Sequence, residues 1–319
     1  MKTNIFYLAV RIALLLGLFC LMNPGWTAIA NGADPVIVTW DNSGGGPHDV
    51  YYMYAVGDQE VWNDSLDYYG ATRTYTNATF SAAYFEGVTA AIIPMPNREA
   101  SYTAAEATAI KDFVDDGGRV LLTGYYDKGY WNYASTNMVA AKWGVEYLVT
   151  EGANYSINRY CQVAETAGNY YGDYNTAPKV KNLADHMITE GVTEYYARGG
   201  SLDISGSDAK ALATGSETAY YNTSATNWVN GTDIVYMAII ENDNGGGILF
   251  TYTPYILRNE YTKLHGEENG YNGSKLPDNI SNWLVNGSPK EEEDSPGFEA
   301  IMIFLVLVPL AIPVLRRRR

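Results

Sequence analysis

The sequence predicts an α/β fold, with helices on both faces of a mostly parallel sheet and antiparallel strands added in the C-terminal half. Three observations predict it. First, short aliphatic runs alternate with helical segments in the first half of the chain. Second, a helix, a glycine turn and a buried strand follow one another over residues 101–124. Third, two apolar runs flank a turn-rich segment within residues 234–252. Because strand–helix–strand units cross over with one hand, the strands of the first half are expected to be parallel.

The first expected elements are separated by residues that break regular structure. A β-branched strand is expected over residues 36–40 and ends at the glycine-rich segment 41–47. A helix is expected over residues 49–69, although its many aromatic residues blur the helical period. The second apolar strand covers residues 90–94, and prolines at its end stop it.

The helix that follows has the clearest start and end. Thr103 and Glu106 form an S/T-x-x-E capping box, in which each side chain bonds the backbone N–H of the other residue. Apolar residues at helical spacing follow up to Val114, and the segment 115–118, Asp-Asp-Gly-Gly, ends the helix. A buried strand is therefore expected over residues 119–124.

The remaining expected elements are a short helix, a strand, a hairpin and a closing helix, at residues 137–143, 145–149, 234–252 and 280–285. The hairpin is predicted because two apolar runs flank a tip rich in Asn, Asp and Gly. Between the second and third of these elements, residues 151–182 are interpreted as an insertion rich in Tyr and Asn.

Composition narrows the class of protein. The 319 residues carry 36 Asp and Glu against 21 Lys and Arg, a formal net charge of −15, which disfavours nucleic acid because its phosphates would be repelled. Two cysteines exclude a disulfide scaffold and most zinc modules. An apolar fraction of 47% supplies a core, so a wholly disordered chain is excluded.

Residues 1–30 have the features of a secretory signal. Lys2 and Arg11 precede an apolar run, and Ala28 and Ala30 form a small-x-small cleavage site. Cleavage is expected after Ala30, and an uncleaved N-terminal anchor is the alternative.

The C-terminus predicts a membrane anchor. Residues 298–315 carry a single charge and are long enough to span a hydrocarbon core, and four arginines after them hold that end in the cytoplasm. Pro296, Gly297 and Phe298 stand directly before the remaining span, after an acidic linker within residues 287–297.

This order of tripeptide, apolar span and basic cluster resembles the archaeal PGF-CTERM sorting signal. The resemblance implies that an archaeosortase cuts near the tripeptide, ahead of the transmembrane or sorting segment 298–319, and that the new C-terminus receives a prenyl-type lipid. An ordinary single-pass helix is the alternative. In both cases the expected location is the archaeal cell surface, on the outer face of the cytoplasmic membrane.

Export makes glycosylation an expectation as well. Without the signal and the terminal segment, the chain has a net charge of −20, which suits divalent cations or a salty exterior. Acceptor sites of the type Asn-x-Ser/Thr stand at Asn63, Asn77, Asn154, Asn222, Asn230, Asn272 and Asn279, and a weaker one at Asn286, where Pro289 follows the serine.

The segment Phe113–Gly124 resembles the helix–turn–strand signature of class I glutamine amidotransferase-like domains. Within that group the chain is most similar to the non-enzymatic branch of DUF4350 and ABC-transport auxiliary proteins. Residues His186–Val192 are similar to the His-Pro-Ile-Thr-x-Gly-Val segment of that branch, with Met187 in place of proline. The resemblance implies a flavodoxin-like fold for a single ectodomain over residues 31–286.

Catalytic members of that superfamily use a Cys on a strand–helix elbow and a His base. Residues 124–129, which follow the expected strand, contain neither Cys nor Ser. Cys161 lies in the insertion and is interpreted as a small buried hydrophobe. None of the three histidines has a partner at metal-ligand spacing. The sequence therefore predicts no catalytic residue and no enzyme.

Two loops have some features of ion sites. Residues 241–246 have a superficial likeness to a calcium loop, but the flanking strands favour a hairpin turn. The run Gly44–Gly46 lacks a P-loop lysine and is interpreted as a loop rather than an anion cradle. No cofactor and no metal are predicted, and a structural Ca²⁺ ion is the alternative.

A ligand of an open α/β sheet binds at the carboxyl ends of its strands. The candidate ligand-binding residues at those positions are Asp41, Asn42, His48, Asn97, Tyr126 and Asp127. The 28 tyrosines, many of them in adjacent pairs, suit sugar stacking or protein contact as well as they suit replacement of Phe in the core.

Three functions follow as hypotheses. The first is a non-catalytic surface protein that binds a glycan, a cation or a neighbouring surface-layer protein, with the archaeosortase as its partner during processing. The second is an accessory subunit of an ABC-type membrane transporter. The third is a surface glycan hydrolase that uses paired carboxylates such as Asp41 and Asp127.

Overall fold

The computed structural model of the protein describes residues 37–41, 60–76, 78–125, 129, 131–149, 164, 178–197, 199–222, 228–252, 256 and 275–289. The expected secretory signal, Cys161, the Pro-Gly-Phe motif and the C-terminal span lie outside these ranges. Within them, no helix combines the length and the apolar character needed to cross a membrane.

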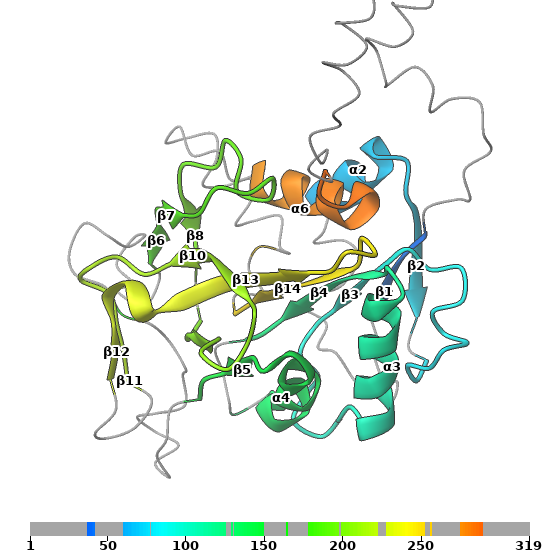
Figure 1. The fold of residues 1–319 in the computed structure, drawn as a ribbon, viewed down its shortest axis with the longest axis horizontal. Helices are drawn as coiled ribbons and strands as arrows, with labels where there is room; N and C mark the ends of the chain where they lie inside the picture. The colour runs from blue at the N-terminus through cyan, green and yellow to red at the C-terminus, as the bar shows by residue number, and fades with distance from the viewer. Residues whose placement is uncertain are drawn as a thin grey trace, which may run out of the picture.

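Among the described residues, the main sheet has eight strands in the order β2–β1–β3–β4–β14–β13–β10–β7 (Figure 1). Its parallel strands are β1 (Ile37–Asp41), β2 (Thr72–Thr76), β3 (Ala90–Ile93), β4 (Arg119–Thr123) and β14 (Gly247–Thr251). Its antiparallel strands are β13 (Val235–Glu241), β10 (Lys210–Thr214) and β7 (Asn182–Leu183). The parallel part follows the flavodoxin-like strand order 2-1-3-4-5, so the predicted fold class is confirmed.

Helices cover both faces of this sheet (Figure 1). Helices α2 (Glu60–Tyr68) and α6 (Lys275–Asn286) lie on one face. Helix α4 (Tyr133–Ala140), which continues into the 3-10 turn η4 (Ala141–Trp143), lies with α3 (Ala104–Asp115) on the other. Strands β3 and β14 are buried along their whole length, as a sheet covered on both faces requires.

The capping box of α3 is present and does more than cap the helix. The Thr103 N–H donates to Glu106 Oε2 at 2.8 Å, and the Glu106 N–H donates to Thr103 Oγ1 at 3.2 Å. The second carboxylate oxygen of Glu106 accepts the N–H of Phe80 at 3.1 Å. This buried carboxylate therefore also holds the loop before β3 against the helix, which a local sequence signal does not reveal.

The tip of the β13–β14 hairpin closes the other end of α3. Asn242 Nδ2 donates to the carbonyl of Val114 at 2.8 Å, and Asn244 Nδ2 donates to the carbonyl of Asp115 at 3.0 Å. Asn242 Oδ1 accepts the N–H groups of Asn244 and Gly246, both at 3.0 Å. The last carbonyls of α3 are thus capped by side chains more than a hundred residues away. The hairpin interpretation of this tip is confirmed.

Segments of two or three residues show no periodicity, and among the short strands that follow only β5 was predicted. They pair as β5 (Glu146–Tyr147) with β9 (Leu202–Asp203), β6 (Lys179–Val180) with β8 (Tyr195–Tyr196), and β11 (Tyr220–Asn222) with β12 (Trp228–Asn230), which the turn η5 (Gly231–Asp233) follows. The strand expected at 145–149 is therefore β5, outside the main sheet. The helices expected at 137–143 and 280–285 begin earlier, at Tyr133 and Lys275.

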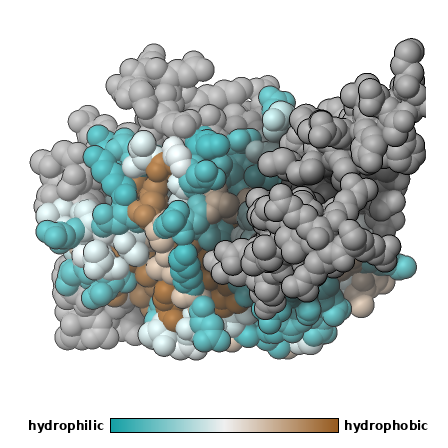
Figure 2. Space-filling view, turned by 45° about the horizontal axis from the view of Figure 1, so that its top comes forward, coloured by the Kyte–Doolittle hydropathy of each residue, from teal (hydrophilic) through white to brown (hydrophobic). Residues whose placement is uncertain are grey.

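Many of the described tyrosines belong to the core. Tyr195 and Tyr196 are both buried, at 2% and 7% exposure, although they are neighbours on one strand. Tyr68 is the contrasting case, at 81% exposure on α2. In Figure 2, the coloured part of the surface is mostly hydrophilic, and apolar side chains show as a band between polar ones. For the buried rings, replacement of Phe in the core is the better of the two interpretations.

Candidate functional site

The strand order reverses between β1 and β3, which is where an open α/β sheet forms its ligand crevice. Asp41 ends β1, and Asn97 follows the neighbouring β3, where it pairs with Trp131 in an isolated bridge. The structure therefore brings the backbones of these two predicted positions to adjacent strand ends. The other candidates, Asn42, His48, Tyr126 and Asp127, lie outside the described residues and stay predictions.

Aromatic side chains fill the position after β4 at which an elbow nucleophile would stand. Tyr125 is 3% exposed and stacks on Trp131, with ring centroids 4.5 Å apart and an interplanar angle of 30°. The hydroxyl of Tyr133 donates to the carbonyl of Tyr125. Among the described residues, the next helix begins at Tyr133.

Close packing around Gly124 leaves no room for a side chain directly after β4. A Cβ atom at Gly124 would lie 2.7 Å from the ring of Tyr147. The Tyr147 hydroxyl donates to the carbonyl of Leu122 at 2.8 Å, inside the core. Burial raises the pKa of Tyr147 well above its ordinary value, so this phenol stays neutral and acts as a hydrogen-bond donor. These rings build a wall behind the carboxyl end of β4.

A cluster of Ser, His and Glu lies at the opposite end of the sheet. His186 Nε2 lies 3.3 Å from Glu241 Oε2, and Ser288 Oγ lies 3.5 Å from the same His186 nitrogen. Ser288 Oγ donates to Glu241 Oε1 at 2.6 Å, and Trp283 Nε1 donates to that oxygen at 2.8 Å. Three segments that are far apart in sequence thus meet at one carboxylate.

The orientation of His186 is unsuited to a catalytic triad. A triad needs the carboxylate on one ring nitrogen and the nucleophile on the other. Here Glu241 and Ser288 both face Nε2, while Nδ1 accepts the N–H of Ile188 at 3.2 Å. The proton on Nε2 is therefore directed at Glu241. The cluster fastens the end of α6 to β13 and has no relay from acid to nucleophile.

Glu241 is the most strongly perturbed carboxylate for which the structure gives a value. Partial burial by itself would raise its pKa, but hydrogen bonds from His186, Ser288 and Trp283 outweigh burial and lower the pKa to about 2. Its unfolded pKa is 4.5, so the interaction stabilises the fold fully above pH 4.5. That contribution disappears as the pH falls from 4.5 towards 2.

Glu241→Gln should lower the free energy of unfolding by about 1–2 kcal/mol at pH 7, and the loss should shrink below pH 4.5. The lowering of the Glu241 pKa corresponds to about 3 kcal/mol of stability. The expected loss is smaller because the Glu241 side chain is 32% exposed, so solvent screens its charge. Urea unfolding of both proteins between pH 2 and pH 7 measures the difference. The exposed Glu217→Gln is the control, and a difference that does not vary with pH would contradict the assignment.

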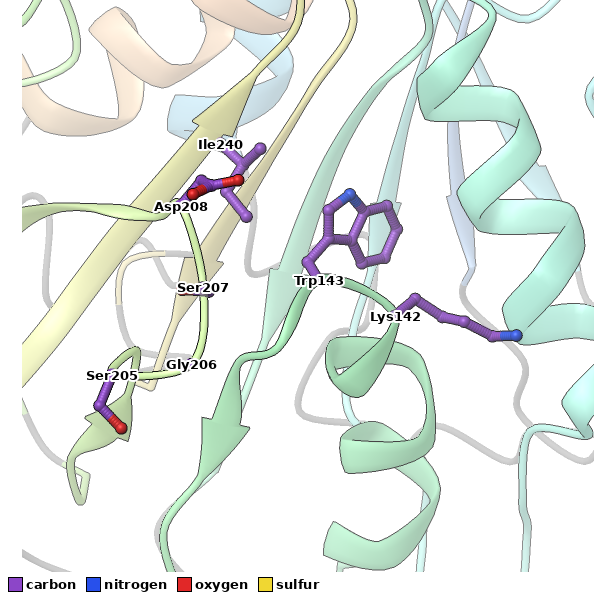
Figure 3. A pocket seen from close by; sticks show the side chains of 7 residues that line it. All are labelled: Lys142, Trp143, Ser205, Gly206, Ser207, Asp208 and Ile240. Atoms are coloured by element: carbon purple, nitrogen blue, oxygen red, sulfur yellow. The ribbon is translucent and has the colours of Figure 1, made fainter.

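A hollow of about 550 Å³ lies on the α3 and α4 side of the sheet. It is lined by Lys142, Trp143, Ser205, Gly206, Ser207, Asp208 and Ile240. Figure 3 shows that the indole of Trp143 stands between α3 on one side and Asp208 with Ile240 on the other, and that Lys142 points away towards α3. A volume of this size is within the range of small-molecule sites.

Close backbone contact forms one wall of this hollow. Gly144 has a φ of +70°, and a Cβ atom there would lie 2.3 Å from the carbonyl oxygen of Gly206. The end of η4 and the loop 204–209 therefore approach each other more closely than side chains would allow. The hollow thus lies where these two segments meet.

The chain was compared with known proteins and solved structures. A scan of protein-family models finds no match to the chain, and a search of curated proteins finds no relative. The mmIFT52 N-terminal domain is similar at a TM-score of 0.54 and 14% identity, over 79% of this chain and 98% of that one. A ThuA-like protein from Bacteroides uniformis has a TM-score of 0.43 and 14% identity, over 82% and 96% of the two chains.

A Thermoplasma acidophilum protein whose description is that of a GMP synthase component has a TM-score of 0.41 and 11% identity, over 79% of this chain and 95% of its own. The chain is flavodoxin-like. At these identities the likeness concerns the arrangement of strands and helices, and the site has to be argued from its own residues.

The structure corrects one predicted glycan acceptor. Asn279 is 6% exposed, and its Nδ2 donates to the carbonyls of Ile188 and Glu190 at 3.0 and 2.8 Å. A glycan on this nitrogen would break both bonds and has no room, so Asn279 is not an acceptor in the folded protein. Asn230 is exposed, and Asn63 is partly exposed. Asn77, Asn154 and Asn272 lie outside the described residues, and the side chain of Asn222 is not described.

Sequence reasoning missed both the Glu241 cluster and the hollow. His186 was singled out only by its resemblance to a family segment, and Trp143 only as the end of a helix. The Ser-Gly-Ser-Asp run at 205–208 is a turn signal that could have marked an exposed loop. Nothing local says that this loop faces Trp143. In the part of the chain that the structure describes, no three His, Cys, Asp or Glu side chains gather as metal ligands.

Proposed function

We propose that this protein is a non-catalytic binding protein displayed on an archaeal cell surface. One observation carries the non-catalytic part of this proposal. The position after β4 that holds the nucleophile in catalytic relatives of the resembled superfamily is occupied here by the buried pair Tyr125 and Trp131. Gly124, which directly precedes Tyr125, has no room for a side chain, because a Cβ atom there would lie 2.7 Å from the ring of Tyr147.

The Ser–His–Glu cluster supports the same proposal. Its histidine directs one nitrogen at Glu241 and uses the other to accept a backbone N–H, so it is not positioned to activate Ser288. The strong hydrogen bonds at Glu241 are explained by stability alone. A chain that keeps the fold and fills its elbow with aromatic rings is suited to recognition rather than turnover.

Display at the cell surface is supported by the two ends of the sequence. The segment that ends at Ala30 directs export, and the Pro-Gly-Phe motif with the span after it anchors the chain to the membrane. The described domain ends at Pro289, a few residues before that motif, so the domain is held near the membrane. Without the signal and the terminal segment, its net charge of −20 keeps it away from anionic partners.

A thermal-unfolding screen of the full-length protein tests this proposal. The protein is purified in a detergent without a sugar headgroup and heated with neutral and acidic glycans and with Ca²⁺, while the glycans are assayed for cleavage. A bound ligand at ten times its Kd adds about 1.4 kcal/mol and raises Tm by roughly 3 °C or more. We expect such a shift without any product. Cleavage of a glycan, or no shift with any ligand, would contradict the proposal.

A further inference from the structure

The hollow beside Trp143 offers both hydrogen-bond donors and acceptors around an aromatic ring. In the described part of the chain, neither the Trp143 Nε1–H nor the carboxylate of Asp208 has a hydrogen-bond or ion-pair partner. The hydroxyl of Ser205 also makes no hydrogen bond to the described residues. By contrast, Ser207 Oγ is already used, because it donates to the carbonyl of Ile204 at 2.9 Å.

The ring of Trp143 is held in place from the side away from Asp208. The ammonium of Lys111 on α3 lies 5.7 Å from the ring centroid, and the same ammonium is paired with Asp115 at 2.6 Å. Phe250 of β14 contacts the indole edge-on, at 6.1 Å between centroids. The indole is thus a fixed platform, and Asp208 and Ile240 lie on its opposite side (Figure 3).

The charges of the lining exclude an anion. Lys142 is the only cation among the lining residues, and its Nζ donates to Thr108 Oγ1 on α3 at 3.0 Å. Figure 3 shows this side chain leaving the hollow. Asp208 remains as the charge that faces the space, and it would repel a carboxylate or a phosphate.

The donors of the lining also disfavour a simple cation. An ammonium or guanidinium group could pair with Asp208, but it has no lone pair to accept the indole N–H of Trp143. A sugar hydroxyl both donates and accepts, so adjacent hydroxyls can bond the carboxylate and the indole N–H together. The apolar face of a pyranose ring packs on an aromatic side chain in the same way that other flat apolar groups do.

From these contacts we infer that the hollow formed by Trp143, Asp208 and the loop 205–208 is a sugar-binding site that takes a neutral pyranose ring. This inference rests on the proposed binding function and gives that function a place and a ligand class. Asp208 accepts from sugar hydroxyls, Trp143 supplies the platform and one donor, and Ile240 closes the apolar side.

Binding of paired sugars to the full-length protein tests the inference. The probes are glucose, galactose and mannose, with glucuronic and galacturonic acid as charged partners of the first two. Saturation-transfer NMR in a detergent without a sugar headgroup gives the Kd of each. We expect at least one neutral sugar to bind, and its uronic acid to bind about tenfold more weakly because Asp208 repels it.

Three variants locate the sugar. Trp143→Ala and Asp208→Ala should each weaken binding about tenfold, whereas Glu217→Gln, at an exposed residue outside the lining of the hollow, should stay within about twofold of the parent. Asp208 is exposed, so its replacement tests the site even if loss of Trp143 disturbs packing. Melting temperatures of all variants are measured alongside.

Two results would overturn the inference and leave the proposed function standing. One is a neutral sugar that binds Asp208→Ala and Trp143→Ala as tightly as the parent, which places the sugar elsewhere on the protein. The other is a uronic acid that binds as tightly as its neutral partner. If no neutral sugar binds, this site assignment is wrong, and the Ca²⁺ and glycan arms of the thermal screen decide the proposed function separately.

Discussion

Gly246→Ala should lower the free energy of unfolding by about 3 kcal/mol or more. A Cβ atom at this position would lie 2.0 Å from the carbonyl oxygen of Val114 and 3.0 Å from that of Gly118. Both atoms belong to backbone, at the end of α3 and the start of β4, so neither can turn aside as a flexible side chain would. The hairpin tip would have to lift away and release the cap that Asn242 makes on the same Val114 carbonyl.

The neighbouring glycine is the matched control for this substitution. Gly245 has a φ of +83° and nothing within 4 Å of its missing Cβ, so Gly245→Ala is strained only by its backbone and should cost about 1 kcal/mol. Urea unfolding of the parent and both variants, followed by far-UV circular dichroism, gives the two losses. Equal losses would mean that the hairpin tip does not pack against α3 as described.

Arg119→Ala should lower the free energy of unfolding by about 3 kcal/mol. Its Nε donates to the carbonyl of Leu284 at 2.7 Å, and its Nη2 donates to that of Val285 at 2.8 Å. Its Nη1 donates to the carbonyl of Gly245 at 3.3 Å. The guanidinium thus satisfies the last carbonyls of α6 and places a positive charge at the negative end of that helix.

Two further arginine variants show what the Arg119 fork contributes. Arg119→Lys keeps the charge but not the fork, so it should cost roughly half as much. Arg73→Ala removes an exposed ion pair with Asp67, at 25% and 56% exposure, and should cost under about 1 kcal/mol. Urea unfolding of the three variants ranks these losses. If Arg119→Ala were no worse than Arg73→Ala, the contacts with α6 would contribute nothing to stability.

The elements predicted well are those whose signals lie within a few residues. The capping box of Thr103 and Glu106 and the glycine stop at 117–118 place α3, and the apolar run after them places β4. The β13–β14 hairpin is placed by two apolar strands that flank a turn. From these pieces and the handedness of crossovers, the parallel flavodoxin-like half follows.

The elements missed depend on partners that are distant in the chain. Strand β2 reads Thr-Arg-Thr-Tyr-Thr, without the aliphatic run that marks the other strands, and it pairs with β1 at the sheet edge. Strand β9 is two residues long, and its partner β5 lies more than fifty residues earlier in the chain. The hydrogen bonds of this pair form only after the main sheet has brought the two segments together, so no local pattern announces β9.

The candidate site shows the same division. The strand ends that bear Asp41 and Asn97 could be predicted, because strand order and direction fix where the carboxyl ends lie. The cluster at Glu241 could not, because it joins residues 186, 241, 283 and 288 through hydrogen bonds that no spacing encodes. The hollow is similar, since Trp143 and Asp208 meet across two loops.

By itself, the sequence determined the fold class and showed that neither Cys nor Ser follows β4. It also predicts the export and anchoring segments. Periodicity, residue identity and terminal motifs are local properties, so they can be read without the structure. Only the tertiary structure decided that aromatic rings fill the space after β4. It also decided that the Ser–His–Glu cluster joins α6 to β13 through hydrogen bonds, and that Trp143 faces the carboxylate of Asp208. Those outcomes depend on distances and burial between distant segments, and packing of the folded chain is what sets them.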